Sequence, residues 1–144
     1  MAPTIYFSGS ISGGRDDAAQ YRRIVDALES RGFHVLAGAV TSHMAEGGEP
    51  LDPCFIFDRD IGWLAQSDVV VAEVSKPSTG VGYEIAAARY RYRIPVIALY
   101  RPVFTPRCTA MVAGDTGIEL IEYSDSTFDD MLERLVNKLS GVAV

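Results

Sequence analysis

Cysteine and histidine are scarce in this sequence of 144 residues, which has two of each. Neither pair has the spacing of metal ligands, and no Ser–His or Cys–His pattern is typical of a nucleophilic triad. We interpret Cys54 and Cys108 as reduced thiols that form no disulfide. The sequence therefore predicts no metal site.

Long hydrophobic runs are also missing. A helix that spans a bilayer needs about 20 consecutive apolar residues, and no stretch approaches that length. The first residues lack the basic and apolar regions of a secretory signal. On these grounds we expect a cytoplasmic protein with no membrane partner.

An excess of basic residues is absent as well. The sequence has 13 Lys and Arg against 19 Asp and Glu, for a formal net charge of -6. Such a protein has little basic surface for the phosphates of a nucleic acid, so we expect no nucleic-acid partner. A single local pocket can still bind a small phosphorylated molecule.

The sequence does contain a regular alternation of apolar runs and amphipathic stretches over residues 1–144, without internal repeats or linkers. The runs predict strands at 5–7, 33–36, 68–74, 95–99 and 118–123. The amphipathic stretches predict helices from about 15 to 32, 53 to 65, 80 to 88 and 128 to 139, with a short helical piece around 109–112. This alternation predicts a single-domain α/β protein of the flavodoxin-like, or Rossmann-like, class. We expect a five-stranded parallel sheet in the order 2-1-3-4-5 with helices on both faces.

In such folds the ligand binds at the carboxyl ends of the strands, next to the first strand. This rule predicts that the loops at 8–14, 74–82 and 100–109 lie together. The first loop has a glycine-rich sequence whose N–H groups could bind an anion, with Gly9, Ser10, Gly14 and Arg15 as contributors. It matches neither dinucleotide nor mononucleotide fingerprints, and an ordinary strand-to-helix turn explains it equally well.

Three further side chains could carry chemistry. Glu84 is predicted in the first turn of a helix, where the helix dipole would keep a nucleophilic carboxylate ionised. It could equally be an ordinary helix-start glutamate. Asp60 is either a solvated side chain or part of the site wall, and Tyr6 either packs in the core or donates its hydroxyl to a neighbouring carboxylate.

Four segments together resemble the nucleoside 2-deoxyribosyltransferase superfamily, and within it the 2'-deoxynucleoside 5'-phosphate N-hydrolases. They are IYFSGSI at 5–11, DIGWL at 60–64, DVVVAEV at 68–74 and PSTGVGYE at 77–84. The resemblance extends from Thr4 to about residue 135. The VGYE block in its order after the DVVVAEV strand is the most specific part of it.

The resemblance implies a flavodoxin-like homodimer without a cofactor. It implies that Glu84 attacks C1' of a deoxynucleotide, that water then hydrolyses the glycosyl-enzyme, and that base and 2-deoxyribose 5-phosphate leave. Asp60 would handle the proton of the base or water, and Tyr6 would orient Glu84. Ser78 would hold the 5'-phosphate, and Thr109 would reach it from the neighbouring subunit. The other binding residues implied are Gly9, Ser10, Ile11, Gly14, Arg15, Gly80 and Met111.

One position departs from the hydrolase pattern. Those hydrolases carry an arginine after the GSI of the first loop, and this sequence has Ser12. Arg15, about one helical turn further along the chain, would have to make the phosphate contact of that arginine instead. The loop at 38–50 is expected to line the base pocket.

Two other functions remain open on the sequence. A deoxyribosyltransferase would move deoxyribose between free bases, but it has no phosphate for Ser78 and Thr109 to hold. Such transferases use an asparagine near the C-terminus, and Asn137, the only asparagine here, has no matching context. A non-catalytic nucleotide-binding domain would not need Glu84 and Asp60.

Overall fold

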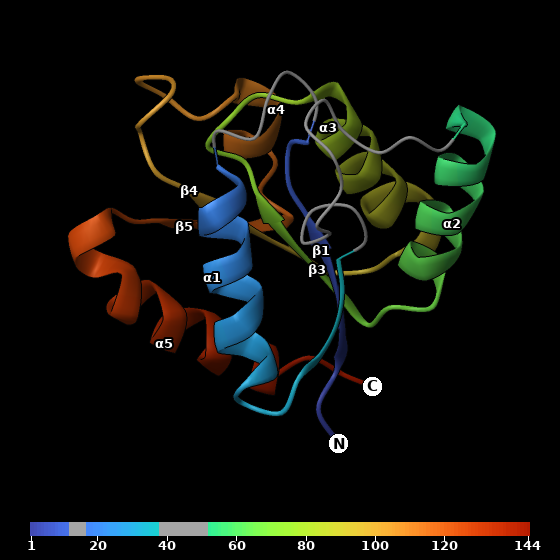
Figure 1. Ribbon diagram of the computed structural model, residues 1–144, viewed down its shortest axis with the longest axis horizontal. Helices are drawn as coiled ribbons and strands as arrows, with labels where there is room; N and C mark the ends of the chain where they lie inside the picture. The colour runs from blue at the N-terminus through green and yellow to red at the C-terminus, as the bar shows by residue number, and fades with distance from the viewer. Residues whose placement is uncertain (12–16, 38–51) are drawn as a thin grey trace.

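Five parallel strands form one sheet in the order β2-β1-β3-β4-β5 in the computed structural model (Figure 1). The predicted class and strand order are therefore confirmed. The structure describes residues 1–11, 17–37 and 52–144. The expectations for Ser12, Gly14, Arg15 and the loop at 38–50 fall outside these residues.

The strands are β1 Thr4–Ser8, β2 His34–Leu36, β3 Val69–Glu73, β4 Val96–Tyr100 and β5 Ile118–Glu122. The helices are α1 Ala18–Glu29, α2 Pro53–Ala65, α3 Thr79–Ala86, α4 Ala110–Ala113 and α5 Phe128–Ser140, with a π-helical turn η2 at Ala87–Tyr92 and a 3-10 turn η3 at Asp125–Thr127. No helix among the described residues is long and apolar enough to cross a bilayer.

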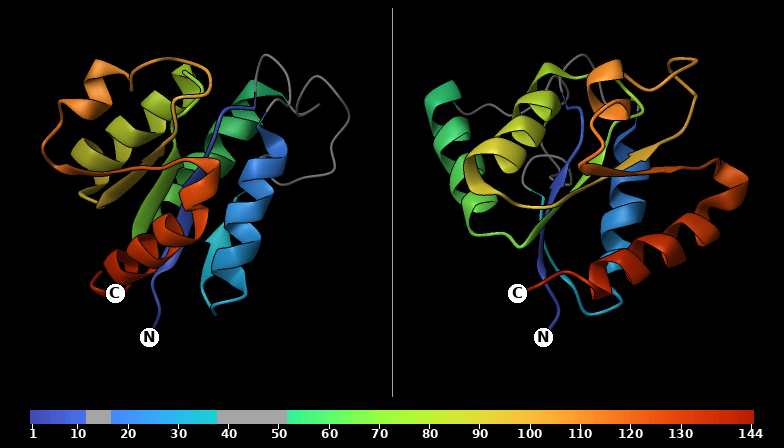
Figure 2. Two further views of the ribbon diagram at one scale, coloured as in Figure 1. Left: turned by 90° about the vertical axis from the view of Figure 1, so that its left-hand side faces the viewer. Right: turned by 180° about the vertical axis from the view of Figure 1, so that it is seen from behind.

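Two hydrophobic cores lie on opposite faces of the sheet. Helices α1 and α5 lie side by side over one face, and α2 and α3 cover the other (Figures 1 and 2). Successive residues of a strand point to opposite faces, so Ile5 and Phe7 enter the first core while Tyr6 enters the second. All five residues of β3 are buried, as expected of a central parallel strand.

Local signals explain where the helices begin and end. Asp52 caps α2 by accepting hydrogen bonds from the N–H groups of Cys54 and Phe55, and Pro53 occupies the first helical position. After α1 the chain passes through Gly32 at φ 89°, a conformation that suits glycine. On α2, Leu64 is fully buried, whereas Phe57 is 44% exposed.

Candidate active site

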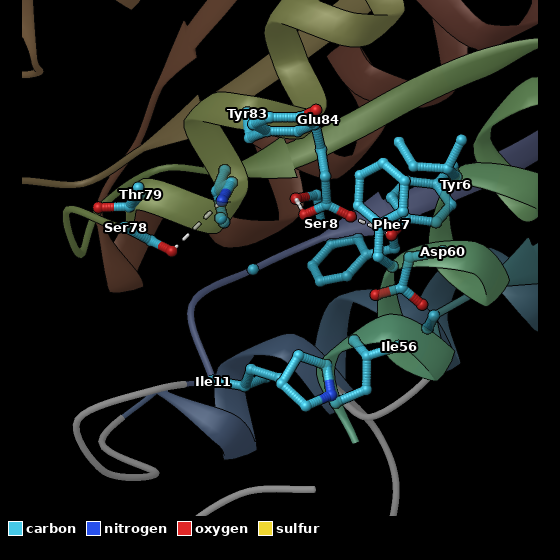
Figure 3. Close-up of a pocket in the computed structure, with 17 residues that line it drawn as sticks. Tyr6, Phe7, Ser8, Ile11, Ile56, Asp60, Ser78, Thr79, Tyr83 and Glu84 are labelled. Atoms are coloured by element: carbon cyan, nitrogen blue, oxygen red, sulfur yellow. Dashed lines mark hydrogen bonds between the residues drawn. The ribbon is translucent and has the colours of Figure 1, made fainter. Parts of the chain in front are cut away.

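A cavity of about 480 Å³ opens beside the carboxyl end of β1, where the strand order reverses. Its walls come from the end of β1, from α2 and from the start of α3 (Figure 3). The lining residues are Tyr6, Phe7, Ser8, Gly9, Ile11, Ala37, Pro53, Ile56, Phe57, Asp60, Ile61, Ser78, Thr79, Gly80, Val81, Tyr83 and Glu84. The structure thus brings together most of the residues predicted from the sequence, but the loop after β4 lines no part of this cavity.

Two hydroxyl groups of β1 hold the Glu84 carboxylate. Tyr6 donates to Oε2, and Ser8 donates to Oε1 at 3.0 Å. Tyr6 and Ser8 are two residues apart on one strand and therefore point to the same face of the sheet. Tyr6 was predicted from the sequence and Ser8 was not, although the spacing of two residues places both side chains on the face toward Glu84.

The Glu84 environment differs from the one predicted. Glu84 is the sixth residue of α3, which begins at Thr79, so it lies in the second turn and not the first. Burial raises the pKa of Glu84 to about 7, and the Asp60 charge adds to this. The hydrogen bonds from Tyr6 and Ser8 act in the opposite direction. Loss of solvation is the largest influence on this pKa, so the carboxyl group is only partly ionised near neutral pH.

Tyr6 stays a proton donor in this arrangement. Its burial, followed by the charge of Glu84, raises the pKa of Tyr6 far above its usual range. A phenol that keeps its proton can only donate to the carboxylate beside it, which fixes the orientation of Glu84.

Asp60 supplies a second carboxylate from α2. Figure 3 shows it on the wall of the cavity that lies beside Tyr6 and Glu84. Arg59 pairs with it, donating from Nε at 2.9 Å and approaching with Nη2 at 2.8 Å. Two carboxyl groups in one cavity, one of them with a pKa near 7, can serve as nucleophile and proton carrier.

The start of α3 offers hydrogen-bond donors at one end of the cavity. The Ser78 hydroxyl caps the helix by accepting from the Val81 N–H at 3.3 Å, which leaves its own proton free to donate. Thr79 and Gly80 follow in the first turn, where N–H groups have no carbonyl partner within the helix. Such a helix start favours an anion.

Gly9 and Ser10 connect the cavity to α1. A Cβ atom at Gly9 would lie 2.9 Å from the Tyr21 ring, so this position requires glycine. The Ser10 N–H donates to the Tyr21 hydroxyl at 3.1 Å, and Ser10 is buried and does not line the cavity. Of the residues predicted here, Gly9 and Ile11 line the cavity, whereas Ser10 contacts Tyr21 on the side away from the cavity.

Thr109 and Met111 lie elsewhere. They line a second hollow of about 960 Å³ between α3, η2 and α4, and Ser78 and Thr79 are shared by the two spaces. Met111 is 84% exposed. Neither residue lines the cavity that contains Glu84.

Of α2, only Asp60 was predicted as part of the site, and the apolar residues beside it were not. Ile56, Phe57 and Ile61 present an apolar surface next to Asp60. Phe57 contacts Tyr83 of α3 edge to face, with ring centroids 6.0 Å apart. An apolar wall of this kind suits a flat aromatic ligand. The described residues contain no group of three or more His, Cys, Asp or Glu that could bind a metal ion.

Replacing Glu84 with glutamine is expected to stabilise the protein at pH 8 and to do so much less at pH 5. The folded-state pKa of about 7 exceeds the ordinary value of 4.5, so the folded protein loses stability as the pH rises through this window. At pH 8 the buried charge costs at most about 3 kcal/mol, and the neutral amide avoids this cost. Denaturant unfolding at both pH values measures the difference.

The exposed glutamate of α5 provides the control, since Glu133→Gln should change stability at neither pH. A Glu84→Gln protein that is no more stable than the unaltered one at pH 8 would contradict a burial-raised pKa.

Comparison with known proteins places the chain in context. The sequence model described as nucleoside 2-deoxyribosyltransferase matches residues 5–122. The chain is 44% identical over 142 residues to the putative 2'-deoxynucleoside 5'-phosphate N-hydrolase 1 of Nematostella vectensis, covering 94% of this chain and 95% of that protein. It is 37% identical to the human 5-hydroxymethyl-dUMP N-hydrolase, covering 92% of this chain and 78% of that one.

Two solved structures share the fold. A conserved protein from Enterococcus faecalis superposes with a TM-score of 0.70 at 18% identity, covering 93% of this chain and 99% of that one. The CMP N-glycosidase of Clostridium botulinum has a TM-score of 0.62 at 16% identity, covering 93% and 98%.

Proposed function

This chain belongs to the nucleoside 2-deoxyribosyltransferase family, and from that premise we propose that it hydrolyses the N-glycosidic bond of 2'-deoxynucleoside 5'-monophosphates. The products are the free base and 2-deoxyribose 5-phosphate. The observation that carries this proposal is the Glu84 carboxylate, held by Tyr6 and Ser8 at the wall of a cavity that also contains Asp60. The names of the relatives support the same reaction.

In the first step Glu84 attacks C1' of the deoxyribose as the bond to the base breaks. The bonding electrons leave with the base, and Asp60 in its acid form supplies the proton that the base needs. The sugar carries positive charge at C1' in the transition state, which an ionised Glu84 stabilises. A 2'-hydroxyl would disfavour that cation, so a 2'-deoxy sugar is preferred.

In the second step water hydrolyses the ester between Glu84 and the sugar. Asp60, now ionised, accepts a proton from the water as its oxygen bonds to C1', and Glu84 leaves as a carboxylate. Tyr6 and Ser8 keep the two Glu84 oxygens in place through both steps. The pair of carboxyls thus returns to its starting protonation state.

The two ends of the cavity bind the 5'-phosphate and the base of the substrate. The Ser78 hydroxyl and the N–H groups of Thr79 and Gly80 bind the 5'-phosphate at the start of α3, with Gly9 and Ile11 beside it. In this proposal Gly14 and Arg15 complete the phosphate contacts. The base lies against the apolar wall formed by Ile56, Phe57 and Ile61.

The proposal is tested by incubating the protein with each 2'-deoxynucleoside monophosphate, with and without a second free base. Chromatography follows the released base. We expect release without an acceptor. Exchange of bases that is faster than release would identify a transferase instead, and no reaction with any monophosphate would contradict catalysis.

We further propose that the protein works as a homodimer in which Thr109 and Met111 complete the site of the partner. The position of Thr109 supports this, since it lies away from its own Glu84 cavity but next to Ser78 and Thr79. The exposed Met111 side chain supplies apolar surface for a second copy.

Mixing two inactive variants should restore activity if this arrangement holds. In a mixed dimer of Glu84→Gln and Thr109→Asp, one site combines an intact Glu84 with an intact Thr109. Half of the dimers are mixed and each has one such site, so about a quarter of the full activity should return. The assay is base release after subunit exchange.

Ser78→Asp replaces Thr109→Asp in the matched control. Ser78 and Glu84 belong to the same cavity, so this mixture leaves every site damaged and should stay inactive. Recovery in both mixtures, or in neither while light scattering reports a dimer, would contradict the proposed role of Thr109.

A further inference from the structure

Four buried side chains form a charged cluster outside the Glu84 cavity. Asp17, Glu73, Arg101 and Tyr123 are 7%, 0%, 6% and 4% exposed, and none of them lines the cavity. The Arg101 guanidinium bonds to Asp17 through Nη2 and donates from Nε to the Tyr123 hydroxyl at 3.2 Å. Tyr123 in turn donates to Glu73. One guanidinium thus serves two buried carboxyl groups.

Such a cluster is an expensive way to stabilise a core. Removing charges from water can cost more than their attraction returns. Burial raises the pKa of Glu73, against the hydrogen bonds that it accepts from Ser75 and Tyr123. The Oδ2 atom of Asp17 is buried without a hydrogen-bond partner among the described residues. These costs favour a role in placing particular segments over a role in general stability.

The cluster fixes the chain where it enters α1. Asp17 immediately precedes this helix. At the other end of the β1–α1 connection, the Tyr21 hydroxyl accepts from the Ser10 N–H, and Gly9 packs against the Tyr21 ring. Gly9 and Ser10 therefore lie against Tyr21 of α1, and Asp17 at the start of the same helix is bonded to Arg101.

The same cluster fixes the loop after β3. The Arg101 N–H donates to Ser75 Oγ at 2.9 Å, and the Ser75 N–H donates to Glu73 Oε1 at 2.7 Å. Ser75 lies three residues before Ser78, the cap of α3. Arg101 comes from the loop after β4 and thus bonds both to Asp17 at the start of α1 and to Ser75 in the loop that leads to Ser78.

We propose that Arg101 is a positioning residue that sets the distance between the β1–α1 connection and the loop after β3, and so shapes the cavity end that binds the 5'-phosphate. This inference rests on the proposed function. Its loss weakens binding of the monophosphate but leaves bond cleavage nearly unchanged, because Glu84 is held by Tyr6 and Ser8 of β1.

The test compares Arg101→Gln and Tyr123→Phe with the unaltered full-length protein. We expect the KM for a deoxynucleoside monophosphate to rise about tenfold in Arg101→Gln, as for a lost charge-assisted contact. The kcat value and its pH profile should stay nearly unchanged. Amide hydrogen exchange should become faster in the segment 75–81.

Leu139→Ala is the control for stability alone. Leu139 is fully buried near the end of α5, a helix whose last turn lies close to the N-terminus of the chain (Figure 2), and its truncation destabilises the protein without removing a hydrogen bond of the cluster. It should lower Tm but leave KM unchanged. If Arg101→Gln does not fold, the milder Tyr123→Phe, with a smaller rise in KM, decides the question.

Two outcomes would overturn the inference. One is an unchanged KM with unchanged exchange in the folded variants, and the other is a fall in kcat with no change in KM. Absence of base release by the unaltered protein would instead refute the proposed function. In that case the exchange measurement still decides whether Arg101 fixes the loop.

Discussion

Replacing Glu84 with glutamine should lower the rate of base release by on the order of 10⁴-fold or more, the largest loss expected for any single substitution here. The amide keeps the size of the side chain, and its single oxygen can still accept from Tyr6, while its NH2 group can donate to the Ser8 hydroxyl instead of accepting from it. It has no negative charge to form a bond with C1' or to stabilise the cation there. Single-turnover base release measured at pH 8 gives the rate of the chemical step.

Covalent trapping separates a nucleophile from a group that acts only through its charge. Denaturing the unaltered protein during turnover should leave a 2-deoxyribose 5-phosphate adduct on the peptide that contains Glu84, as seen by mass spectrometry. Glu84→Gln should form none. An adduct on another residue would refute the assignment, as would a Glu84→Gln protein that retains most of its activity.

The pH dependence follows from the same carboxylate. The nucleophile must be ionised, and its pKa in the free protein is about 7. We therefore expect kcat/KM to fall about tenfold per pH unit below this value. The ionised form that catalysis requires is the form that burial makes costly, so the rate rises with pH over the range in which stability falls.

Asp60→Asn should have the second largest effect, a loss of about 10²- to 10⁴-fold, as is typical for the removal of a general acid or base. The asparagine cannot protonate the departing base or accept a proton from water. Steady-state base release measures the loss. The loss should be smaller for substrates whose base leaves easily without a proton.

Asp58 offers a matched control on the same helix. It is two residues away on α2, it is exposed, and it does not line the cavity. Asp58→Asn should therefore retain full activity. Equal losses in the two variants would attribute the effect to the charge of α2 and contradict a specific role of Asp60.

Much of the fold could be predicted from the sequence because it follows from local patterns. The three consecutive valines of β3 indicate a strand buried on both faces, and the structure buries all five of its residues. The cap at Asp52 and the proline after it place the start of α2 correctly. Right-handed crossovers then leave few possible strand orders, and 2-1-3-4-5 is the observed one.

The site was only partly readable, because its properties depend on contacts between distant segments. Tyr6 and Glu84 are 78 positions apart, and no periodicity indicates that their side chains meet. The apolar wall that α2 adds and the burial that raises the pKa of Glu84 to about 7 also require packed helices. The cluster around Arg101 was not predicted because a buried arginine in a loop has no distinct sequence pattern.

The sequence by itself determined the alternation of strands and helices, the face of β1 from which Tyr6 and Ser8 project, and the position of Glu84 on the helix after β3. These depend on backbone periodicity and capping, which act over a few residues. Only the tertiary structure decided that the two hydroxyls meet Glu84, that Thr109 lies in a separate hollow, and that Arg101 joins two loops. The physical reason is that desolvation and long-range hydrogen bonds exist only once the sheet has brought its carboxyl ends together.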